Sequence, residues 1–264
     1  MNTSDILSNR IKELAERAYS ENRYLFTDFL DMSQLSVFYA LERELRYVGT
    51  AVSGGMPVSS GVDGNDSAGG LGDRCMVRFG SPEVCGYEED FPIDVLHISP
   101  VQKKFSDTLT HRDFLGSVIG LGIERTKLGD ILVRDNEAYM FVSNTISDYI
   151  IETLNKVKHT NVTVERCTEL PAELAPKFSE ESVVVSSNRL DAIIARTYNM
   201  SRELAARFIT EGKVFVCGRE IISTTKSLKE GDVVSVRGKG KFIFDGEEGV
   251  TRKSKLYVKI KRYV

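Results

Sequence analysis

Two stretches that are unsuited to a folded core divide this sequence into three foldable segments. Residues 53–72 are rich in glycine and serine and hold almost no large apolar side chain, which is typical of a flexible loop or insertion. Residues 169–181 carry Pro171, Pro176 and several glutamates, which indicates a linker. We therefore expect an N-terminal segment, a middle domain, a linker and a C-terminal domain with a basic extension, spanning residues 1–70, 71–167, 168–185 and 186–264.

The charge is divided unevenly between these segments. Residues 186–264 contain 17 Lys and Arg against 9 Asp and Glu, a net charge of +8, whereas residues 1–185 contain 18 against 29, a net charge of −11. The formal net charge of −3 for the whole chain hides this division. A short basic domain repels itself unless a polyanion neutralises it, so the C-terminal domain favours a nucleic-acid partner.

Hydropathy and the spacing of cysteine and histidine exclude several classes of protein. The longest apolar stretch without charge, Phe114–Ile123, is too short to span a bilayer, and Met1–Arg17 lacks the apolar core of a signal peptide, so we expect a cytoplasmic protein. The four cysteines form no CxxC pair, and the three histidines form no HxxxH pair. We therefore expect free thiols, no metal site and no cofactor. The glycine-rich stretch also lacks the Lys-Ser/Thr pair of a phosphate-binding loop.

Periodic apolar residues predict the elements of the first two segments. Helical spacing in residues 7–18 and 35–45 predicts an N-terminal helical segment, with Asp31 or Ser33 as the cap of the second helix. The middle domain reads β-β-α-β-β-α-β, which favours helices on one face of an antiparallel sheet, as in a ferredoxin or RRM fold. Its predicted elements are strands 76–79 and 91–98, helix 110–121, a hairpin of strands 130–133 and 138–142, helix 146–157 and strand 162–166.

The C-terminal domain begins with two short predicted helices, Asn188–Tyr198 and Arg202–Glu211. Ser201 is the expected N-cap of the second helix and Gly212 its stop, and Leu204, Ala205, Phe208 and Ile209 form its expected buried face. Strands 214–216, 219–222 and 233–236 follow, and then the loop Arg237–Lys241 places three cations among glycines. The predicted fold class of the whole chain is therefore α+β.

Several of these residues suit a nucleic-acid backbone. Ser201 and Arg202 lie at a predicted helix N-terminus, where free N–H groups and the helix dipole favour phosphate. Arg189 begins the neighbouring helix, and a glycine-rich loop lets Lys239 and Lys241 approach a phosphate closely. The full set of expected RNA-binding residues is Arg189, Ser201, Arg202, Lys213, Arg219, Arg237, Lys239 and Lys241.

The C-terminal sequence resembles an S4 RNA-binding domain. The residues that carry this resemblance are Arg189-Leu190-Asp191, Ser201-Arg202, Ala205, Ile209, Gly212-Lys213-Val214, Val216, Gly218 and Gly231-Asp232. Cys217 departs from the pattern, because the family usually has Asn before this Gly.

The resemblance extends upstream to the YlmH-like family of bacterial S4-domain proteins, whose genes often lie among cell-division genes. It is carried by Leu109–Gly116, Leu121–Ile123, Gly129–Val133, Gly54–Pro57 and Ser186-Ser187, whereas residues 58–78 depart from the family. The family implies RNA binding, an RRM-like middle domain and association with ribosomes or their large subunits. The expected partners are structured RNA, either rRNA or tRNA, and the large ribosomal subunit, with no membrane and no small-molecule substrate.

Three other patterns have two interpretations. His111-Arg112-Asp113 could be catalytic, but adjacent helical residues point in different directions, so a structural or RNA-contacting role is favoured and no catalytic residue is expected. Tyr139 and Phe141 alternate as in an RRM stacking strand, but core packing is favoured. The tail 255–263 presents lysines and tyrosines on one face of a strand, either for RNA or as a solvated edge.

The preferred function is a non-enzymatic RNA-binding protein. An RNA-modifying enzyme that uses the S4 unit for docking is one alternative, and an interaction factor linked to cell division is the other.

Overall fold

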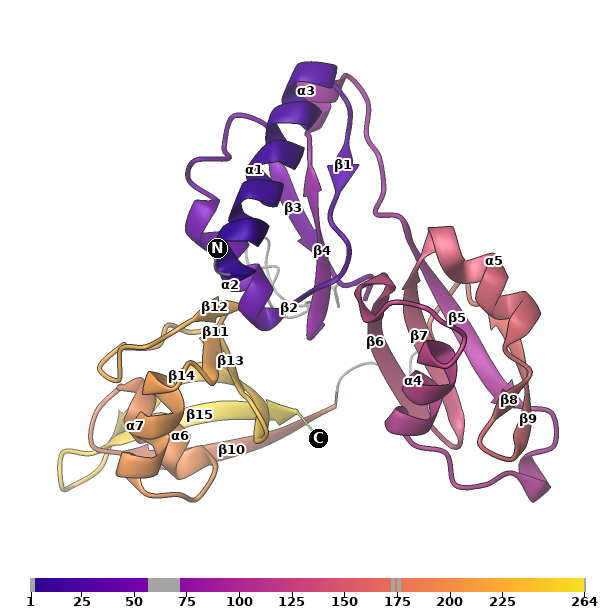
Figure 1. Cartoon of the computed structure of the whole chain (residues 1–264). Helices are drawn as coiled ribbons and strands as arrows, with labels where there is room; N and C mark the ends of the chain where they lie inside the picture. The colour runs from indigo at the N-terminus through magenta and orange to yellow at the C-terminus, as the bar shows by residue number, and fades with distance from the viewer. Residues whose placement is uncertain (1–2, 57–71, 172–173, 175–176, 264) are drawn as a thin grey trace. The chain divides into compact units, whose positions relative to one another are not determined.

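The computed structural model describes residues 3–56, 72–171, 174 and 177–263, and it mixes helices with antiparallel sheets throughout (Figure 1). The expected α+β class is therefore confirmed. Residues 1–59 and 70–175 form one compact unit, and residues 176–264 belong to a second. Most of the predicted glycine-rich loop, residues 57–71, lies outside the described residues.

The N-terminal part of the first unit is a small sheet with two helices, α1 (Thr3–Glu21) and α2 (Met32–Leu41). Asp31 caps α2: its carboxylate accepts the Gln34 N–H at 3.0 Å, and the Gln34 side chain accepts the Asp31 N–H at 2.9 Å. The sheet contains strands β1 (Leu25–Phe26), β2 (Leu30–Asp31), β3 (Thr50–Ser53) and β4 (Arg74–Phe79), and the short helix α3 (Pro82–Cys85) follows.

Two expectations for this part were wrong. The N-terminal segment is not purely helical, because three short strands interrupt it. The strand at residues 76–79 does not join the sheet of the middle domain, since β4 pairs with β1, β2 and β3. Its register brings Val77 opposite Val52 and buries Val77 in the core under α1 and α2.

The middle part forms a separate sheet with strand order β6-β7-β5-β9-β8. Its strands are β5 (Ile93–Pro100), β6 (Leu128–Arg134), β7 (Glu137–Ser143), β8 (Lys156–Val157) and β9 (Thr160–Arg166). Its helices are α4 (His111–Ile119) and α5 (Asn144–Thr153), together with the 3-10 turns η2 (Lys103–Phe105) and η3 (Arg125–Lys127). Both α-helices contribute to one hydrophobic core with the sheet, as predicted.

Local signals explain the ends of these elements. Asp135 and Asn136 both have positive φ, 50° and 65°, which forms the predicted two-residue hairpin between β6 and β7. Helix α5 ends at Thr153, earlier than expected, and Val157 lies in β8 rather than in the helix. The cause is a second tight hairpin, in which Val157 pairs with Thr160 and Lys158 has a φ of 53°.

The other face of the middle sheet packs against the N-terminal part of the same unit. Phe141 is fully buried in a cluster with Phe29 and Met76. The Arg74 guanidinium donates to the carbonyl oxygens of Phe29 at 2.8 Å and Leu128 at 2.9 Å, which ties the two sheets together. Core packing, the favoured interpretation of Phe141, is confirmed, and Tyr139 is only 9% exposed.

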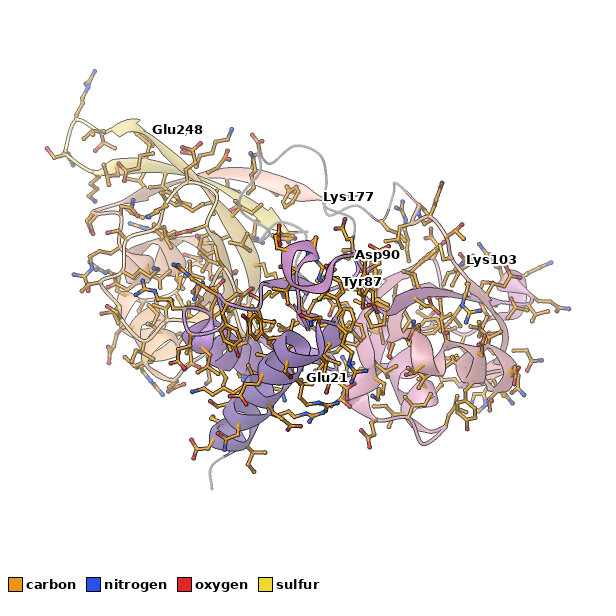
Figure 2. All side chains as sticks on the ribbon, turned by 90° about the horizontal axis from the view of Figure 1, so that it is seen from above. Glu21, Tyr87, Asp90, Lys103, Lys177 and Glu248 are labelled. Atoms are coloured by element: carbon orange, nitrogen blue, oxygen red, sulfur yellow. The ribbon has the colours of Figure 1, made fainter. Side chains whose placement is uncertain are left out.

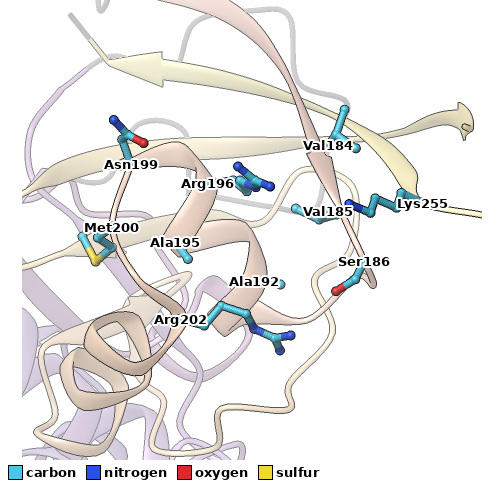
Figure 3. A pocket seen from close by; sticks show the side chains of 10 residues that line it. All are labelled: Val184, Val185, Ser186, Ala192, Ala195, Arg196, Asn199, Met200, Arg202 and Lys255. Carbon is cyan, nitrogen blue, oxygen red and sulfur yellow. The ribbon is translucent and has the colours of Figure 1, made fainter. Parts of the chain in front are cut away.

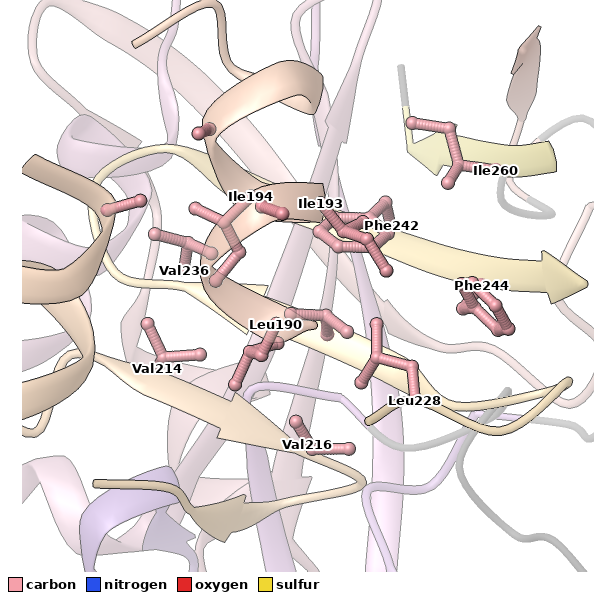
Figure 4. Close-up of a cluster of buried hydrophobic side chains, with 14 of the residues drawn as sticks. Leu190, Ile193, Ile194, Val214, Val216, Leu228, Val236, Phe242, Phe244 and Ile260 are labelled. Atoms are coloured by element: carbon pink, nitrogen blue, oxygen red, sulfur yellow. The ribbon is translucent and has the colours of Figure 1, made fainter. Parts of the chain in front are cut away.

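The second unit is a six-stranded antiparallel sheet with order β10-β15-β14-β13-β11-β12. Its strands are β10 (Phe178–Val185), β11 (Val214–Val216), β12 (Arg219–Glu220), β13 (Val233–Val236), β14 (Gly240–Val250) and β15 (Leu256–Tyr263). Helices α6 (Leu190–Thr197) and α7 (Arg202–Thr210) pack on the sheet. Leu190, Ile194, Phe242 and Ile260 belong to the core between helices and sheet (Figure 4).

Three features of the second unit differ from what the sequence indicated. The predicted linker 168–185 contains strand β10, which pairs with β15 at every position from Phe178 to Val185. The tail strand is therefore not a solvated edge, because β15 lies between β10 and β14. On α7, Leu204 is 38% exposed instead of buried, whereas Ala205 and Ile209 are buried as expected.

Candidate nucleic-acid interface

Two arginines at the start of the helix pair meet at one buried carboxylate. Asp191, in the first turn of α6, has a side chain that is 7% exposed. Arg189 donates to it through Nε at 3.1 Å and Nη2 at 3.2 Å, and Arg202 donates through Nη2 at 2.7 Å. Burial alone would raise the pKa of Asp191, but the hydrogen bonds from Arg202 and Arg189 lower it, so the carboxylate is ionised at neutral pH.

This arrangement leaves part of each guanidinium available to a ligand. The side chains of Arg189 and Arg202 are 38% and 50% exposed, and the group of three carries a net charge of +1. Arg202 uses one of its five N–H groups for Asp191, so its remaining donors are open to an anion. The structure therefore brings together two of the residues predicted from sequence and fixes their orientation.

Ser201 acts as the predicted cap of α7. Its hydroxyl oxygen accepts the Leu204 N–H at 3.1 Å, and Gly212 ends the helix region with a φ of 68°. Because the hydroxyl is used as a cap, Ser201 fixes the helix end beside Arg202.

A second group of expected residues lies near the start of β11 and the turn that follows β13. The Arg237 N–H donates to the Lys213 carbonyl at 2.9 Å, so these two residues are neighbours. Lys213 pairs with Glu211 at 2.7 Å, and the Arg237 guanidinium lies over Phe215. Lys239 lies in the turn to β14, and Lys241 pairs across the sheet with Ser235. The ion pair of Lys213 with Glu211 shares no residue with the group of Arg189, Asp191 and Arg202.

Tyr198, at the end of α6, helps to explain why residue 240, after the turn that follows β13, is a glycine. Burial raises the pKa of Tyr198 to about 12, and its hydroxyl has no hydrogen-bond partner among the described residues. That hydroxyl lies 3.9 Å from the position a Cβ on Gly240 would take, and Gly240 has a φ of 112°. A side chain at Gly240 would be strained and would touch Tyr198.

Arg219 lies at the other end of β11, opposite Val216. The turn before it contains Cys217 at a φ of 48° and Gly218 at 75°. A left-handed backbone is uncommon for cysteine, so the departure from the usual Asn is a site of local strain. The Cys217 Sγ donates weakly to Asp232 at 3.5 Å.

The three cations of β15 are paired with carboxylates. Lys259 contacts Glu180 at 3.1 Å and Asp245 at 3.5 Å, and Lys261 contacts Asp245 at 2.7 Å. Arg262 contacts Glu181 at 3.6 Å. This neutralisation makes the strand face a weaker candidate for RNA than the sequence indicates.

Sequence reasoning missed two cations beside the arginine pair. Arg196 on α6 and Lys255 at the start of β15 line a pocket of about 260 Å³ together with Arg202 (Figure 3). The helical position of Arg196 is readable from sequence, but Lys255 reaches this pocket only through the pairing of β15 with β10.

The His111-Arg112-Asp113 group has the geometry of a helix start. Asp113 accepts the Thr110 N–H at 2.8 Å and the Thr110 hydroxyl at 2.6 Å, and it pairs with Lys158 at 2.9 Å. The bonds from Thr110 and Lys158 lower the pKa of Asp113 to about 2, which is unsuited to a general base at neutral pH. Asp113 therefore has a structural role.

Within the described residues, no group of three or more His, Cys, Asp or Glu side chains could hold a metal ion. In the same part of the chain, every helix is too short or too polar to cross a membrane.

The fold and the arginine pair define an α+β protein with a basic surface that is suited to phosphate. A family model described as "Putative RNA-binding domain in YlmH" matches residues 87–170. A ribosome-associated protein quality control protein P2 from Bacillus subtilis is 28% identical over 253 residues, which cover 95% of this chain and 91% of that protein. The chain is therefore similar to the YlmH-like family, over residues 87–170 by the family model and over nearly its whole length by the Bacillus subtilis relative.

Two further similarities are partial. A small ribosomal subunit protein uS4 from Phenylobacterium zucineum is 31% identical over 100 residues, which cover 35% of this chain and 49% of that protein. A solved structure of the cell division protein ylmH from Streptococcus pneumoniae has a TM-score of 0.46 and 20% identity, covering 63% of this chain and 93% of that chain.

Proposed function

We propose that this protein binds structured RNA on the ribosome and acts without catalysing a reaction. The proposed target is rRNA or tRNA on the large subunit, and the proposed processes are translation or ribosome quality control in the cytoplasm. The name of the Bacillus subtilis relative and the matched family model support the ribosomal and RNA-binding parts. The net charge of +8 over residues 186–264 supports a polyanionic partner.

The proposal assigns a fold to each of two domains. We propose an S4 domain built around α6, α7, β11 and β13, and strands β10, β14 and β15 extend its sheet. Because β10 begins at Phe178, the proposed start of the domain is residue 178 instead of residue 186. The middle part is proposed to be RRM-like, with four main strands and two helices on one face. Its opposite face packs in part against Phe29 and Met76, so base stacking there is not proposed.

One observation carries the proposal: Asp191 holds two half-exposed arginines in fixed positions at the start of α6 and α7. Fixing these side chains before binding removes part of the entropy cost, about 0.5–1.5 kcal/mol for each long side chain. Arginine forks match phosphate geometry, and they contact RNA through its backbone, independently of base sequence. We therefore infer recognition of RNA shape.

The first test is to follow the protein through a sucrose gradient of ribosomal particles and to sequence the RNA that crosslinks to it. We expect the protein with large-subunit particles and crosslinks in folded rRNA or tRNA. A protein that stays at the top of the gradient and crosslinks to no specific RNA would refute the ribosomal proposal.

The second test is to replace Arg189 or Arg202 by Ala in the full chain. Each change should weaken binding to several structured RNAs alike and reduce the log–log salt slope by roughly 0.7–0.9. Arg202 should matter more, because it lies at a capped helix N-terminus and keeps more of its donors open. Arg207→Ala, which removes an exposed arginine from the last turn of the same helix, is the control. Unchanged affinity and slope in the double variant would reject this interface.

A further inference from the structure

The pocket beside α6 has an unusual balance of charge. Its walls come from the end of β10, from α6, from the turn before α7, and from the start of β15. The ten lining residues include three cations, Arg196, Arg202 and Lys255, and none of these described residues is acidic (Figure 3). A concave site lined by three cations, of which only Arg202 is paired with a described carboxylate, favours an anion.

Two of these cations have no anionic partner within the structure. In residues 177–263, neither Arg196 nor Lys255 forms an ion pair with a described carboxylate, and both side chains are exposed. The nearby strand cations behave differently: Lys259 and Lys261 are held by Glu180 and Asp245. The acidic residues of this unit therefore neutralise the strand face and leave the pocket positive.

The backbone around Lys255 is fixed by the hairpin of β14 and β15. Val185, the last residue of β10, pairs with Leu256, so the neighbouring Lys255 lies beside the end of β10. The Thr251 N–H donates to the Lys255 carbonyl at 2.7 Å, and the Lys255 N–H donates to the Thr251 hydroxyl at 3.0 Å.

The base of the same hairpin is anchored to the rest of the unit. Asn188 donates to Glu247 at 2.9 Å, and Ser182 donates to Glu248 at 3.1 Å. Glu248 lies on this hairpin in Figure 2. The anchors hold Lys255 on one side of the pocket while Arg196 and Arg202 project from the helices.

The floor of the pocket is apolar and small. Ala192 and Ala195 are 4% and 5% exposed, and Val184, Val185 and Met200 also line the pocket, together with the polar Ser186 and Asn199. A volume of about 260 Å³ exceeds what a phosphate group alone requires, so an attached sugar can lie against this apolar floor. The site thus combines a cationic rim with an apolar base, which fits one nucleotide unit.

We propose that this pocket binds a phosphate of RNA together with its sugar, with Arg196, Arg202 and Lys255 as the phosphate ligands. The inference rests on the proposed RNA-binding function and adds a contact site on the α6 and hairpin side of Arg202. The phosphate can come from inside the RNA strand or from its 5′ end, and the test separates these two sources.

The experiment measures binding of the full chain to one hairpin RNA that carries either a 5′-phosphate or a 5′-hydroxyl. Arg196→Gln and Lys255→Gln should each weaken binding by about threefold to tenfold, and the double variant should flatten the log–log salt slope by roughly 0.7–0.9. Loss with both RNAs identifies an internal phosphate, whereas loss only with the phosphorylated RNA identifies the 5′ end. Lys255→Arg, which keeps the charge, should bind within about twofold of the parent chain.

Lys259→Gln is the matched control, because Lys259 lies on the same strand but is already paired with Glu180 and Asp245. It should change neither affinity nor slope. If the double variant binds both RNAs as the parent does while Arg189→Ala weakens binding, the pocket inference is wrong and the proposed function stands. If the double variant of Arg189 and Arg202 also binds as the parent does, the pocket and the arginine interface both fail. Equal losses in Lys255→Gln and Lys255→Arg, with a lowered melting temperature, would show a structural role and overturn the inference.

Discussion

The buried carboxylate of Asp191 should stabilise the helix pair by an amount that can be measured. In Asp191→Asn the side chain keeps its size but loses its charge. The carboxylate accepts three hydrogen bonds from two guanidinium groups. An amide oxygen can still accept from one arginine, but the amide NH2 would face the donors of the other, so at least one guanidinium loses its partner.

The size of the effect follows from the exposure of the partners. A hydrogen bond to a charged group contributes about 1.5–3 kcal/mol, and breaking a fully buried pair costs about 3–5 kcal/mol. Asp191 is buried, but both arginine side chains are more than a third exposed, and solvent screens them. We therefore expect Asp191→Asn to lower the free energy of unfolding by about 2 kcal/mol.

Hydrogen exchange of backbone amides in α6 and α7, followed by mass spectrometry, measures this locally. A loss of about 2 kcal/mol should speed exchange in residues 190–210 by about thirtyfold at neutral pH, if this region opens with the whole unit. Glu203→Gln, which removes an exposed acidic residue from the first turn of α7, should speed exchange by no more than about fivefold. Equal protection in Asp191→Asn and the parent chain would refute the argument that the carboxylate stabilises the helix pair.

The pH dependence has a defined sign. The pKa of Asp191 in the folded protein lies below the 3.8 of an unperturbed aspartate. The ion-pair contribution is therefore present above that pH and is lost as the pH falls through the folded-state pKa. The difference in melting temperature between the parent chain and Asp191→Asn should shrink as the pH falls below 3.8 and through the lowered folded-state pKa. A difference that grows on acidification would contradict the assignment.

Three further predictions concern other parts of the molecule. Cys217→Asn should raise the stability of the second unit by up to about 1 kcal/mol, seen as a higher melting temperature, because Asn tolerates the left-handed backbone; Cys217→Ala should give no gain. Phe141→Ala should cost about 3–5 kcal/mol in urea unfolding, whereas the exposed Phe178→Ala should cost far less. Deleting the gene should remove no modified nucleotide from rRNA or tRNA, as mass spectrometry of digested RNA would show; one reproducibly missing modification would favour an enzyme.

Elements with strong local signals were predictable from sequence. The hairpin at Asp135-Asn136 and the cap at Ser201 depend on residues within a few positions of each other, and both are confirmed. Strand β10 was read as a linker, because its composition is half polar and the strand that satisfies its backbone lies about 70 residues later. Register with a distant partner leaves little trace in a single sequence.

In the candidate site, too, the local features were predictable from sequence and the contacts between distant residues were not. Sequence placed Arg189 and Arg202 at neighbouring helix starts, and it named Asp191 among the residues that carry the S4 resemblance. The structure adds that this carboxylate joins both arginines, which depends on how α6 and α7 pack. The charge of the tail strand was also misjudged, because its neutralising glutamates, Glu180 and Glu181, lie on a strand that was not predicted.

The strand order also determines when each part of the second unit can fold during synthesis. Strand β10 is made early, but β15 is its only strand partner among the described residues, so β10 has no sheet to join until residues 256–263 are available. At about 5–20 residues per second, the interval between Val185 and Leu256 lasts several seconds. During that interval α6, α7 and β11–β13 can assemble, whereas the valine-containing segment of β10 remains exposed and unpaired. Nascent chains arrested before Leu256 should therefore be sensitive to proteases at β10 and resistant in α6.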